Sequence, residues 1–406
     1  MKMKRISLGI LSLLLALLMV FPLASCGGNT AQETTAATTA ATTEAPPKYT
    51  VLLFAPASTQ IHTTAQANYL ANSDPHSILT YATATQEISK PNPIELRWSV
   101  PVSAMGQIRS YTVRIWTKKD ASDAKETTVS GNALSLSLYN LFVGQTYYWS
   151  VSALDDEGDI SVSETATFTT DAQAPRNIYV DSVTNVRDIG GWTTRDGGRV
   201  RQGLLYRGAR LNANFETTVS VSEAGIRTLR DELGIKTEID LRQTQEVNDR
   251  NESGGRTTSP LGEDVTYLAY PMDYGDVLIT EQKNIERVKQ VFHLLADERN
   301  YPIYFHCSIG TDRTGLIAWL VNGLLGVDEA DLWRDYLFSD FGKIESDPAK
   351  ARTRAKNEGV YVNQIKAKDG ANLEEKTYNF LKDYFGVPEA DLRSVIRILK
   401  EAPTEK

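Results

Sequence analysis

The chain is poor in cysteine, because its 406 residues include only Cys26 and Cys307. The two lie far apart in the sequence, so a framework of disulfide bonds is not expected. Long basic runs are also missing, and the net charge is −8. This excludes the positively charged stripe that marks a nucleic-acid-binding protein, so no nucleic-acid partner is expected. A pocket in an acidic protein can still be locally positive, because a pocket focuses its own field.

The apolar run near the N-terminus is short for a membrane span. It covers residues 6–23, is interrupted near its end by Pro22, and follows the basic residues Lys2, Lys4 and Arg5. A positive start, an apolar core and small residues before a cleavage point are typical of a secretory signal. An uncleaved transmembrane anchor is the alternative, and the length of the run disfavours it.

The residues that follow this run, Leu23-Ala24-Ser25-Cys26, resemble the lipobox of bacterial lipoproteins. The resemblance implies that residues 1–25 are a signal peptide and that the Cys26 thiol is acylated. Several acyl chains give firm attachment, so we expect an exported protein anchored to the outer face of a bacterial membrane. Cleavage elsewhere would leave Cys26 free. Residues 26–48 are rich in Thr and Ala, which predicts a flexible tether.

Short stretches of alternating apolar and polar residues occupy the middle of the chain. They cover residues 93–100, 111–117 and 146–154, and a turn at residues 156–159 precedes a further candidate strand at residues 164–169. A period of two with β-branched and aromatic residues favours half-buried strands. The region of residues 49–172 is therefore predicted to be an all-β sandwich.

This middle region resembles a fibronectin type III module. The resemblance rests on Trp98, on the stretch from Leu141 through Gly144 to Trp149, and on Phe168-Thr169-Thr170. Such a module either binds a sugar, the cell wall or a protein partner, or acts as a spacer above the membrane. The spacer is favoured, because the sequence alone identifies no exposed aromatic patch.

The second half of the chain alternates predicted helices and strands. Its helices are expected at residues 222–234, with Ser222 as N-cap and Gly234 as stop, at 282–298 and at 314–325, and its strands at 237–241 and 303–305. Alternation of this kind predicts an α/β domain with a mostly parallel central sheet.

One junction in this half carries a motif with a clear chemical meaning. Cys307 ends a predicted strand, five residues intervene, and Arg313 begins the next predicted helix. A loop of this length can turn its backbone N–H groups toward one point, where the positive end of the helix also lies. Arg313 can bind a phosphate with two hydrogen bonds. The predicted phosphate-binding residues are Ser308, Ile309, Gly310, Thr311 and Thr314.

The same field favours a thiolate at Cys307, which makes this residue the candidate nucleophile. The hydroxyl of Thr314 can donate to the sulfur when it leaves. The neighbouring His306 is expected to orient the loop through hydrogen bonds rather than to react. The alternative is a buried structural cysteine at a strand end, and the flanking pattern disfavours it.

The stretch from His306 to Gly315 resembles the cysteine-dependent tyrosine and dual-specificity phosphatase superfamily, within it the bacterial branch of secreted phosphatases. Residues 185–191, 203–211 and 239–242 support the resemblance, which covers about residues 177–400. It implies a phosphatase fold with a parallel sheet and no metal or other cofactor. The implied substrate is a phosphorylated protein, with phosphotyrosine first, or a small phosphomonoester.

Two other functions remain open at this point. Phosphoinositide phosphatases of the superfamily often carry Lys at the position of Thr311. The threonine therefore weakens the hypothesis that the chain is a phosphoinositide or inositol phosphate phosphatase. A phosphate-recognising binding lipoprotein is the other alternative. The presence of Cys307 argues against it, because a protein that only binds phosphate needs no thiol.

A phosphatase also needs a general acid for the leaving oxygen. Asp312 is the first candidate, since a carboxylate beside a phosphate site can have its pKa raised into a useful range. Asp273, on a loop after a predicted strand, is the second. Four other charged residues are interpreted as structural ion pairs near the site, namely Arg187, Asp188, Asp240 and Arg242.

Overall fold

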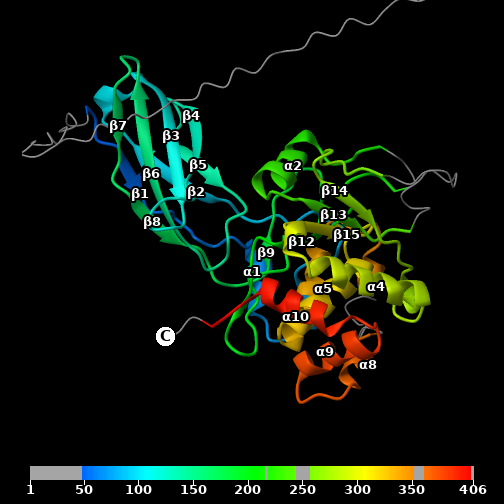
Figure 1. Cartoon of the computed structure of the whole chain (residues 1–406). Helices are drawn as coiled ribbons and strands as arrows, with labels where there is room; N and C mark the ends of the chain where they lie inside the picture. The colour runs from blue at the N-terminus through cyan, green and yellow to red at the C-terminus, as the bar shows by residue number, and fades with distance from the viewer. Residues whose placement is uncertain (1–47, 215–217, 244–256, 352–360, 404–406) are drawn as a thin grey trace, which may run out of the picture. The chain divides into compact units, whose positions relative to one another are not determined.

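The computed structural model describes residues 48–214, 218–243, 257–351 and 361–403 (Figure 1). The predicted signal peptide, Cys26 and nearly all of the predicted tether lie outside these ranges, so they stay predictions. Within the described ranges, no helix has both the length and the hydropathy that a membrane span requires.

The middle region folds as two packed β-sheets. One sheet has the order β1 (Leu52–Phe54), β2 (Ile94–Ser99) and β5 (Ser135–Leu138). The other has the order β4 (Lys125–Ser130), β3 (Ile108–Trp116), β6 (Thr146–Asp155) and β7 (Ile160–Val162), with β8 (Ala166–Thr169) also paired to β6. Alternate side chains such as Trp98, Tyr111 and Trp149 fill the core between the sheets, which confirms the predicted sandwich.

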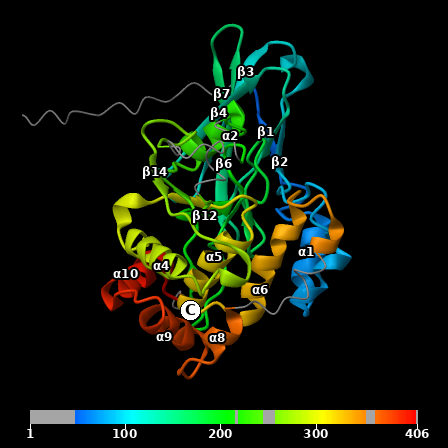
Figure 2. The same cartoon turned by 90° about the vertical axis from the view of Figure 1, so that its right-hand side faces the viewer.

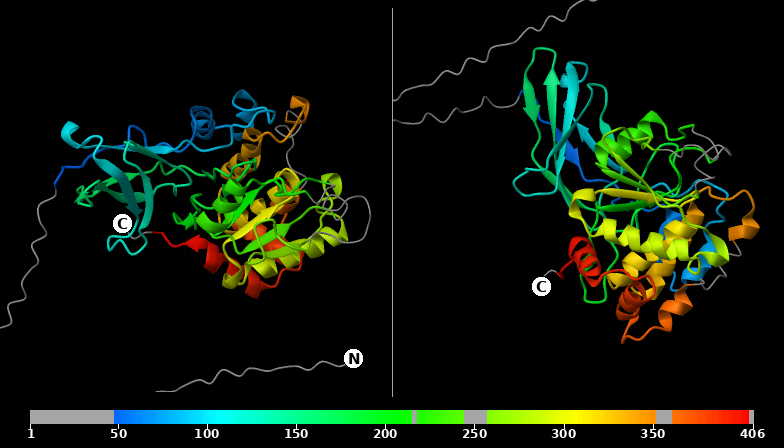
Figure 3. Two further views of the ribbon diagram at one scale, coloured as in Figure 1. Left: turned by 90° about the horizontal axis from the view of Figure 1, so that it is seen from above. Right: turned by 45° about the vertical axis from the view of Figure 1, so that its right-hand side comes forward.

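The chain between β1 and β2 departs from the all-β expectation for residues 49–172. This inserted segment, residues 55–93, contains helix α1 (Thr64–Ala71) and the 3₁₀ helix η1 (Pro75–Thr80). Thr63 caps α1 by accepting a hydrogen bond from the backbone N–H of Gln66. Four of its buried apolar side chains, Tyr69, Leu70, Ile78 and Ala82, belong to the hydrophobic core of the second half, whereas Ile61 belongs to the core of the sandwich. Figures 2 and 3 show α1 beside helix α6 (Glu329–Leu337) of that half.

A six-stranded sheet forms the centre of the second half. Its order is β14 (Thr266–Ala269), β13 (Thr237–Asp240), β15 (Ile303–His306), β12 (Leu205–Gly208), β10 (Arg187–Asp188) and β9 (Arg176–Asn177). The first four strands pair in parallel, and β10 pairs antiparallel with both of its neighbours, β12 and β9. The predicted mostly parallel sheet is therefore confirmed. All residues of β15 are buried, as expected for a central parallel strand.

Apolar layers cover both faces of this sheet. Ile303 and Phe305 of β15 pack in the larger core with helices α4 (Gln282–Leu295) and α5 (Asp312–Leu324), whereas Tyr304 belongs to the core on the opposite face, with Leu229 and Leu233. This alternation follows from the period of two along a strand. The helix predicted at residues 222–234 begins after its Ser222 cap, and Gly234 follows with a φ of +68°.

The remaining elements complete this half. The helices are α2 (Glu223–Arg227), continued by a π turn (Thr228–Glu232), α4 (Gln282–Leu295), α5 (Asp312–Leu324), α6 (Glu329–Leu337), α8 (Val362–Lys366), α9 (Leu373–Asp383) and α10 (Glu389–Leu399). Short 3₁₀ turns span Gly275–Val277, Glu298–Asn300 and Phe338–Phe341, and β11 (Arg199–Val200) pairs with β16 (Lys400–Glu401). One further 3₁₀ turn, Val102–Ala104, lies in the sandwich between β2 and β3.

Candidate active site

The loop that carries the motif joins the end of β15 to the start of α5, so the predicted strand–loop–helix arrangement is confirmed. Gly310 lies in this loop with a φ of +75°. A Cβ built on it would lie only 2.3 Å from the backbone oxygen of Gly208 on β12. Glycine is therefore required here by both conformation and space.

Four successive backbone carbonyls of the loop accept hydrogen bonds from side chains outside it. The pairs are His306 Nδ1 with Cys307 O (3.0 Å), Arg210 Nη1 with Ser308 O (3.1 Å), Asn185 Nδ2 with Ile309 O (2.9 Å) and Arg207 Nη2 with Gly310 O (2.8 Å). In a trans peptide the carbonyl and the next N–H point in opposite directions. The N–H groups of residues 308–311 therefore turn away from these partners, as an anion-binding nest requires.

Cys307 is almost completely buried at the base of this loop, with 1% of its surface exposed. Burial by itself disfavours the thiolate. The charge of Arg313 and hydrogen bonding by Thr314 outweigh burial, so the pKa of the Cys307 thiol is lowered from its ordinary value. The negative charge of Asp312 works in the opposite direction.

Arg313 lies in the first turn of α5 and is also buried. Its Nη1 is 3.4 Å from the carbonyl oxygen of Leu241 and 3.3 Å from that of Met272. The ring of Tyr274 covers the guanidinium at 5.1 Å. The arginine is therefore held between the end of β13 and the loop that follows β14.

The two candidate general acids have different surroundings. Asp312 is half-buried at the start of α5, and its Oδ1 lies 3.4 Å from the hydroxyl of Tyr336. Asp273 accepts from Lys283 Nζ at 2.9 Å and from the side-chain amide of Gln243. The Lys283 and Gln243 contacts hold the pKa of Asp273 below its ordinary value.

A buried carboxylate joins two arginines beneath the loop. Asp335 of α6 contacts Arg187 Nε at 2.9 Å and Arg207 Nη1 at 2.6 Å, and Arg207 also donates to the carbonyl of Gly310. Sequence reasoning missed Asp335, and it assigned no role to Arg207, Arg210 or Asn185. All three of these residues lie in the stretches 185–191 and 203–211, which was the signal that could have identified them.

The four charged residues predicted to form structural ion pairs do not make one set. Asp240 pairs with Arg242 at 2.5 Å, whereas Arg187 pairs with Asp335, and Asp188 pairs with Arg176 at 3.0 Å. Each pair is buried, so each charge needs its partner to offset the loss of water.

His306 lies between two acceptors. Its Nε2 is 2.9 Å from Glu238 Oε1, and its Nδ1 is 3.0 Å from the carbonyl oxygen of Cys307. Burial opposes a charge on the ring, but Asp240 and Glu238 outweigh it and raise the pKa of His306. A protonated ring can donate to both oxygens, which agrees with the expected role of His306 in orienting the loop.

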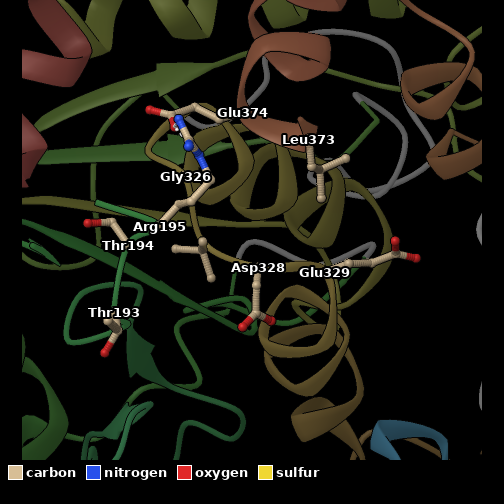
Figure 4. Close-up of a pocket in the computed structure, with 9 residues that line it drawn as sticks. Thr193, Thr194, Arg195, Gly326, Asp328, Glu329, Leu373 and Glu374 are labelled. Carbon is tan, nitrogen blue, oxygen red and sulfur yellow. Dashed lines mark hydrogen bonds and ion pairs between the residues drawn. The ribbon is translucent and has the colours of Figure 1, made fainter. Parts of the chain in front are cut away.

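A separate hollow of about 390 Å³ lies away from this loop. Its lining combines Thr193, Thr194, Arg195, residues 326–329, Leu373 and Glu374 (Figure 4). Arg195 and Glu374 face one another across 3.3 Å. None of the residues that line the hollow belongs to the loop of residues 307–313.

Two family models match the chain. A model of the tyrosine phosphatase family matches residues 178–403, and a model of the fibronectin type III domain matches residues 82–169. The first therefore covers more than half of the chain, including the whole loop around Cys307.

Two curated bacterial proteins resemble the second half. A candidate tyrosine-protein phosphatase of Cupriavidus necator is 26% identical over 191 residues, which covers 41% of this chain and 64% of the relative. A tyrosine-protein phosphatase of Nostoc commune is 26% identical over 179 residues, covering 44% of this chain and 54% of the relative. The chain thus spans less than two thirds of the length of either protein.

The middle region has a relative of its own. Fibronectin type III domain-containing protein 2 of Margaritifera margaritifera is 34% identical over 87 residues. The match covers 21% of this chain and 14% of the relative, so the similarity is confined to one module.

Proposed function

The chain belongs to the tyrosine phosphatase family, and we propose on this basis that it hydrolyses phosphate monoesters through a phosphocysteine at Cys307. The observation that carries the proposal is the loop of residues 307–313. Its carbonyls are held outward, its thiol has a lowered pKa, and Arg313 lies in the first turn of the helix that follows. A dianionic phosphate matches this arrangement of donors.

The reaction would proceed in two displacements. The Cys307 thiolate attacks phosphorus, and the bond between phosphorus and the ester oxygen breaks as that oxygen takes a proton. Water then attacks the phosphocysteine, the bond to sulfur breaks, and inorganic phosphate is released. The backbone N–H groups of residues 308–311, with Arg313, stabilise the charge that develops on the phosphoryl oxygens. Thr314 stabilises the departing sulfur.

We assign the proton donor to Asp312 rather than Asp273. The carboxylate of Asp273 is occupied by its ion pair with Lys283 and by the side-chain amide of Gln243, and these contacts favour its charged form. Asp312 lies immediately before Arg313 and close enough to Cys307 for its charge to raise the pKa of the thiol. After the first displacement, the same carboxylate can accept the proton of the attacking water.

Phosphotyrosine in a protein is the preferred substrate. A small phosphomonoester would react by the same two displacements. An inositol phosphate or phosphoinositide is the second candidate. The guanidinium of Arg210, which donates to Ser308 O, adds positive charge beside the loop and favours a substrate with a second phosphate. Thr311 supplies no such charge.

The deciding experiment measures phosphate release from p-nitrophenyl phosphate and a phosphotyrosine peptide, with EDTA present, for the wild type and Cys307→Ser. Release that resists EDTA and disappears in Cys307→Ser is the expected result. Release that persists in the variant would overturn the cysteine mechanism. Release only from an inositol polyphosphate would support the second substrate class, and no release from any substrate by the folded, reduced protein would favour a binding lipoprotein.

We also propose export and attachment to the outer face of a bacterial membrane through acylated Cys26, with the sandwich as a spacer. The predicted signal and lipobox support this location. Cys26→Ser is expected to move the protein from the membrane fraction to the soluble exported fraction. A protein that stays in the membrane fraction after this substitution would contradict lipid anchoring. Retention on sugar or cell-wall polymer would show that the sandwich is also a binding module.

A further inference from the structure

The inserted segment, residues 55–93, leaves the sandwich and bonds to the backbone that follows α6. Ala84 N donates to Asp340 O at 2.8 Å, and Ile88 N donates to Phe341 O at 2.8 Å. In the other direction, Ile344 N donates to Ala84 O at 3.0 Å. Backbone bonds in both directions fix this part of the segment in place.

Ser89, near the end of the same segment, is connected to the loop around Cys307. Its Oγ accepts a hydrogen bond from Asn185 N at 3.3 Å, and Asn185 Nδ2 donates to the carbonyl oxygen of Ile309 at 2.9 Å. Arg187 Nη1 donates to Asn185 Oδ1 at 2.5 Å, which fixes the orientation of the amide. Asn185 has a φ of +61°, a conformation that asparagine adopts more readily than most residues.

An apolar contact reinforces this connection. Ala84 is fully buried with Ile344 in a small hydrophobic cluster, and both Leu79 and Ile309 pack against that cluster. The side chain and the carbonyl of Ile309 therefore both meet groups that depend on the inserted segment. Loop, segment and cluster form one packed unit.

We propose that the inserted segment supports phosphate binding by holding the loop around Cys307 in place. Ser89 and Leu79 are its positioning residues. They act through Asn185 and Ile309, which hold the Ile309–Gly310 peptide so that the Gly310 N–H faces the anion. The inference rests on the proposed function and assigns the fibronectin-like region a role beyond that of a spacer. A nest binds well only if its donors are held in place before the ligand arrives.

The test measures binding rather than turnover. In the Cys307→Ser protein, the dissociation constant of inorganic phosphate is obtained from the shift of the melting temperature with phosphate concentration. Adding Ser89→Ala or Leu79→Ala is expected to weaken phosphate binding about two- to tenfold, the range for one lost hydrogen bond or contact. Ser89→Thr keeps the hydroxyl and should restore binding. Thr83→Ala, an exposed change in the same segment, is the matched control.

The outcomes separate the inference from the proposed function. If the Ser89→Ala and Leu79→Ala proteins bind phosphate as tightly as the Thr83→Ala protein, the inference is wrong, whereas the proposed phosphatase function is unaffected. If the Cys307→Ser parent binds no phosphate, both the inference and the proposed function are wrong. If Ser89→Ala does not fold, Leu79→Ala and Ser89→Thr decide, and KM in the active protein should rise with Leu79→Ala and stay near wild type with Ser89→Thr.

Discussion

Arg207 Nη1 lies 2.6 Å from Asp335 Oδ2, and both side chains are buried beneath the loop that holds Cys307. Asp335 also contacts Arg187, so this one carboxylate balances two buried guanidinium groups. The charges of Arg187 and Arg207 outweigh the effect of burial and hold the pKa of Asp335 below its ordinary value. The pairing connects helix α6 to the floor of the site.

Asp335→Asn should therefore strongly destabilise the protein. Removing one member of a buried ion pair typically costs about 3–5 kcal/mol, because the remaining charge has lost both water and partner. Urea unfolding at neutral pH would measure this loss. Glu389→Gln breaks an exposed pair with Arg393 on α10 and should cost at most about 1 kcal/mol. Equal effects of the two substitutions would contradict the buried-pair interpretation.

The lowered pKa of Cys307 predicts the pH dependence of its alkylation. In a Cys26→Ala protein Cys307 is the only thiol, so the rate of reaction with iodoacetamide reports on its thiolate. The midpoint should lie below about 8.5, the value of a free thiol. Arg313→Ala should move it upward, because the favourable charge is lost. An unchanged midpoint in that variant would show that Arg313 does not stabilise the thiolate.

The identity of the general acid can be tested by varying the leaving group. Asp312→Asn should lower kcat about 10²- to 10⁴-fold on phenyl phosphate, whose leaving oxygen needs a proton. The loss should be much smaller on p-nitrophenyl phosphate, because nitrophenolate leaves without one. Asp273→Asn serves as the comparison and should affect both substrates alike. The reverse pattern would transfer the role to Asp273.

Two glycines with similar backbone conformations provide a test of the loop geometry. Gly310 and Gly386 have φ values of +75° and +66°, but only Gly310 has backbone atoms where a Cβ would go. Gly386→Ala should cost about 1–2 kcal/mol and leave activity intact. Gly310→Ala should abolish phosphate release, since the Gly208 backbone must move. Full activity of folded Gly310→Ala would be incompatible with the close approach of β12.

The parts of this fold that follow from local patterns could be predicted from the sequence. The strand, loop and helix around Cys307 are contiguous in the sequence. Their hydrophobic periodicity, together with Gly310, was therefore sufficient to predict the strand–loop–helix arrangement. The strands of the sandwich likewise alternate with a period of two. Helix α5 begins at Asp312, just before Arg313, where the motif placed the start of the helix.

The partners of the loop could not be predicted in the same way. Asp335 lies on a helix remote in sequence from Arg187 and Arg207, and no local pattern connects an acidic residue with a distant arginine. The inserted segment was assigned to the sandwich because strands flank it. Its helix α1 is short, and its buried residues Tyr69, Leu70 and Ile78 pack against a core that only the folded chain creates.

The inserted segment also affects which parts of the chain recombination could replace independently. Because β1 and β2 flank it, recombination that replaced the sandwich would remove α1 and η1 with it. The ring centroid of Tyr69 lies 6.2 Å from that of Phe338 and 5.8 Å from that of Phe341. Without Tyr69, the apolar surface of these two phenylalanines would be exposed to water. Replacing residues 49–172 as a block would therefore also remove part of the hydrophobic core of the second half.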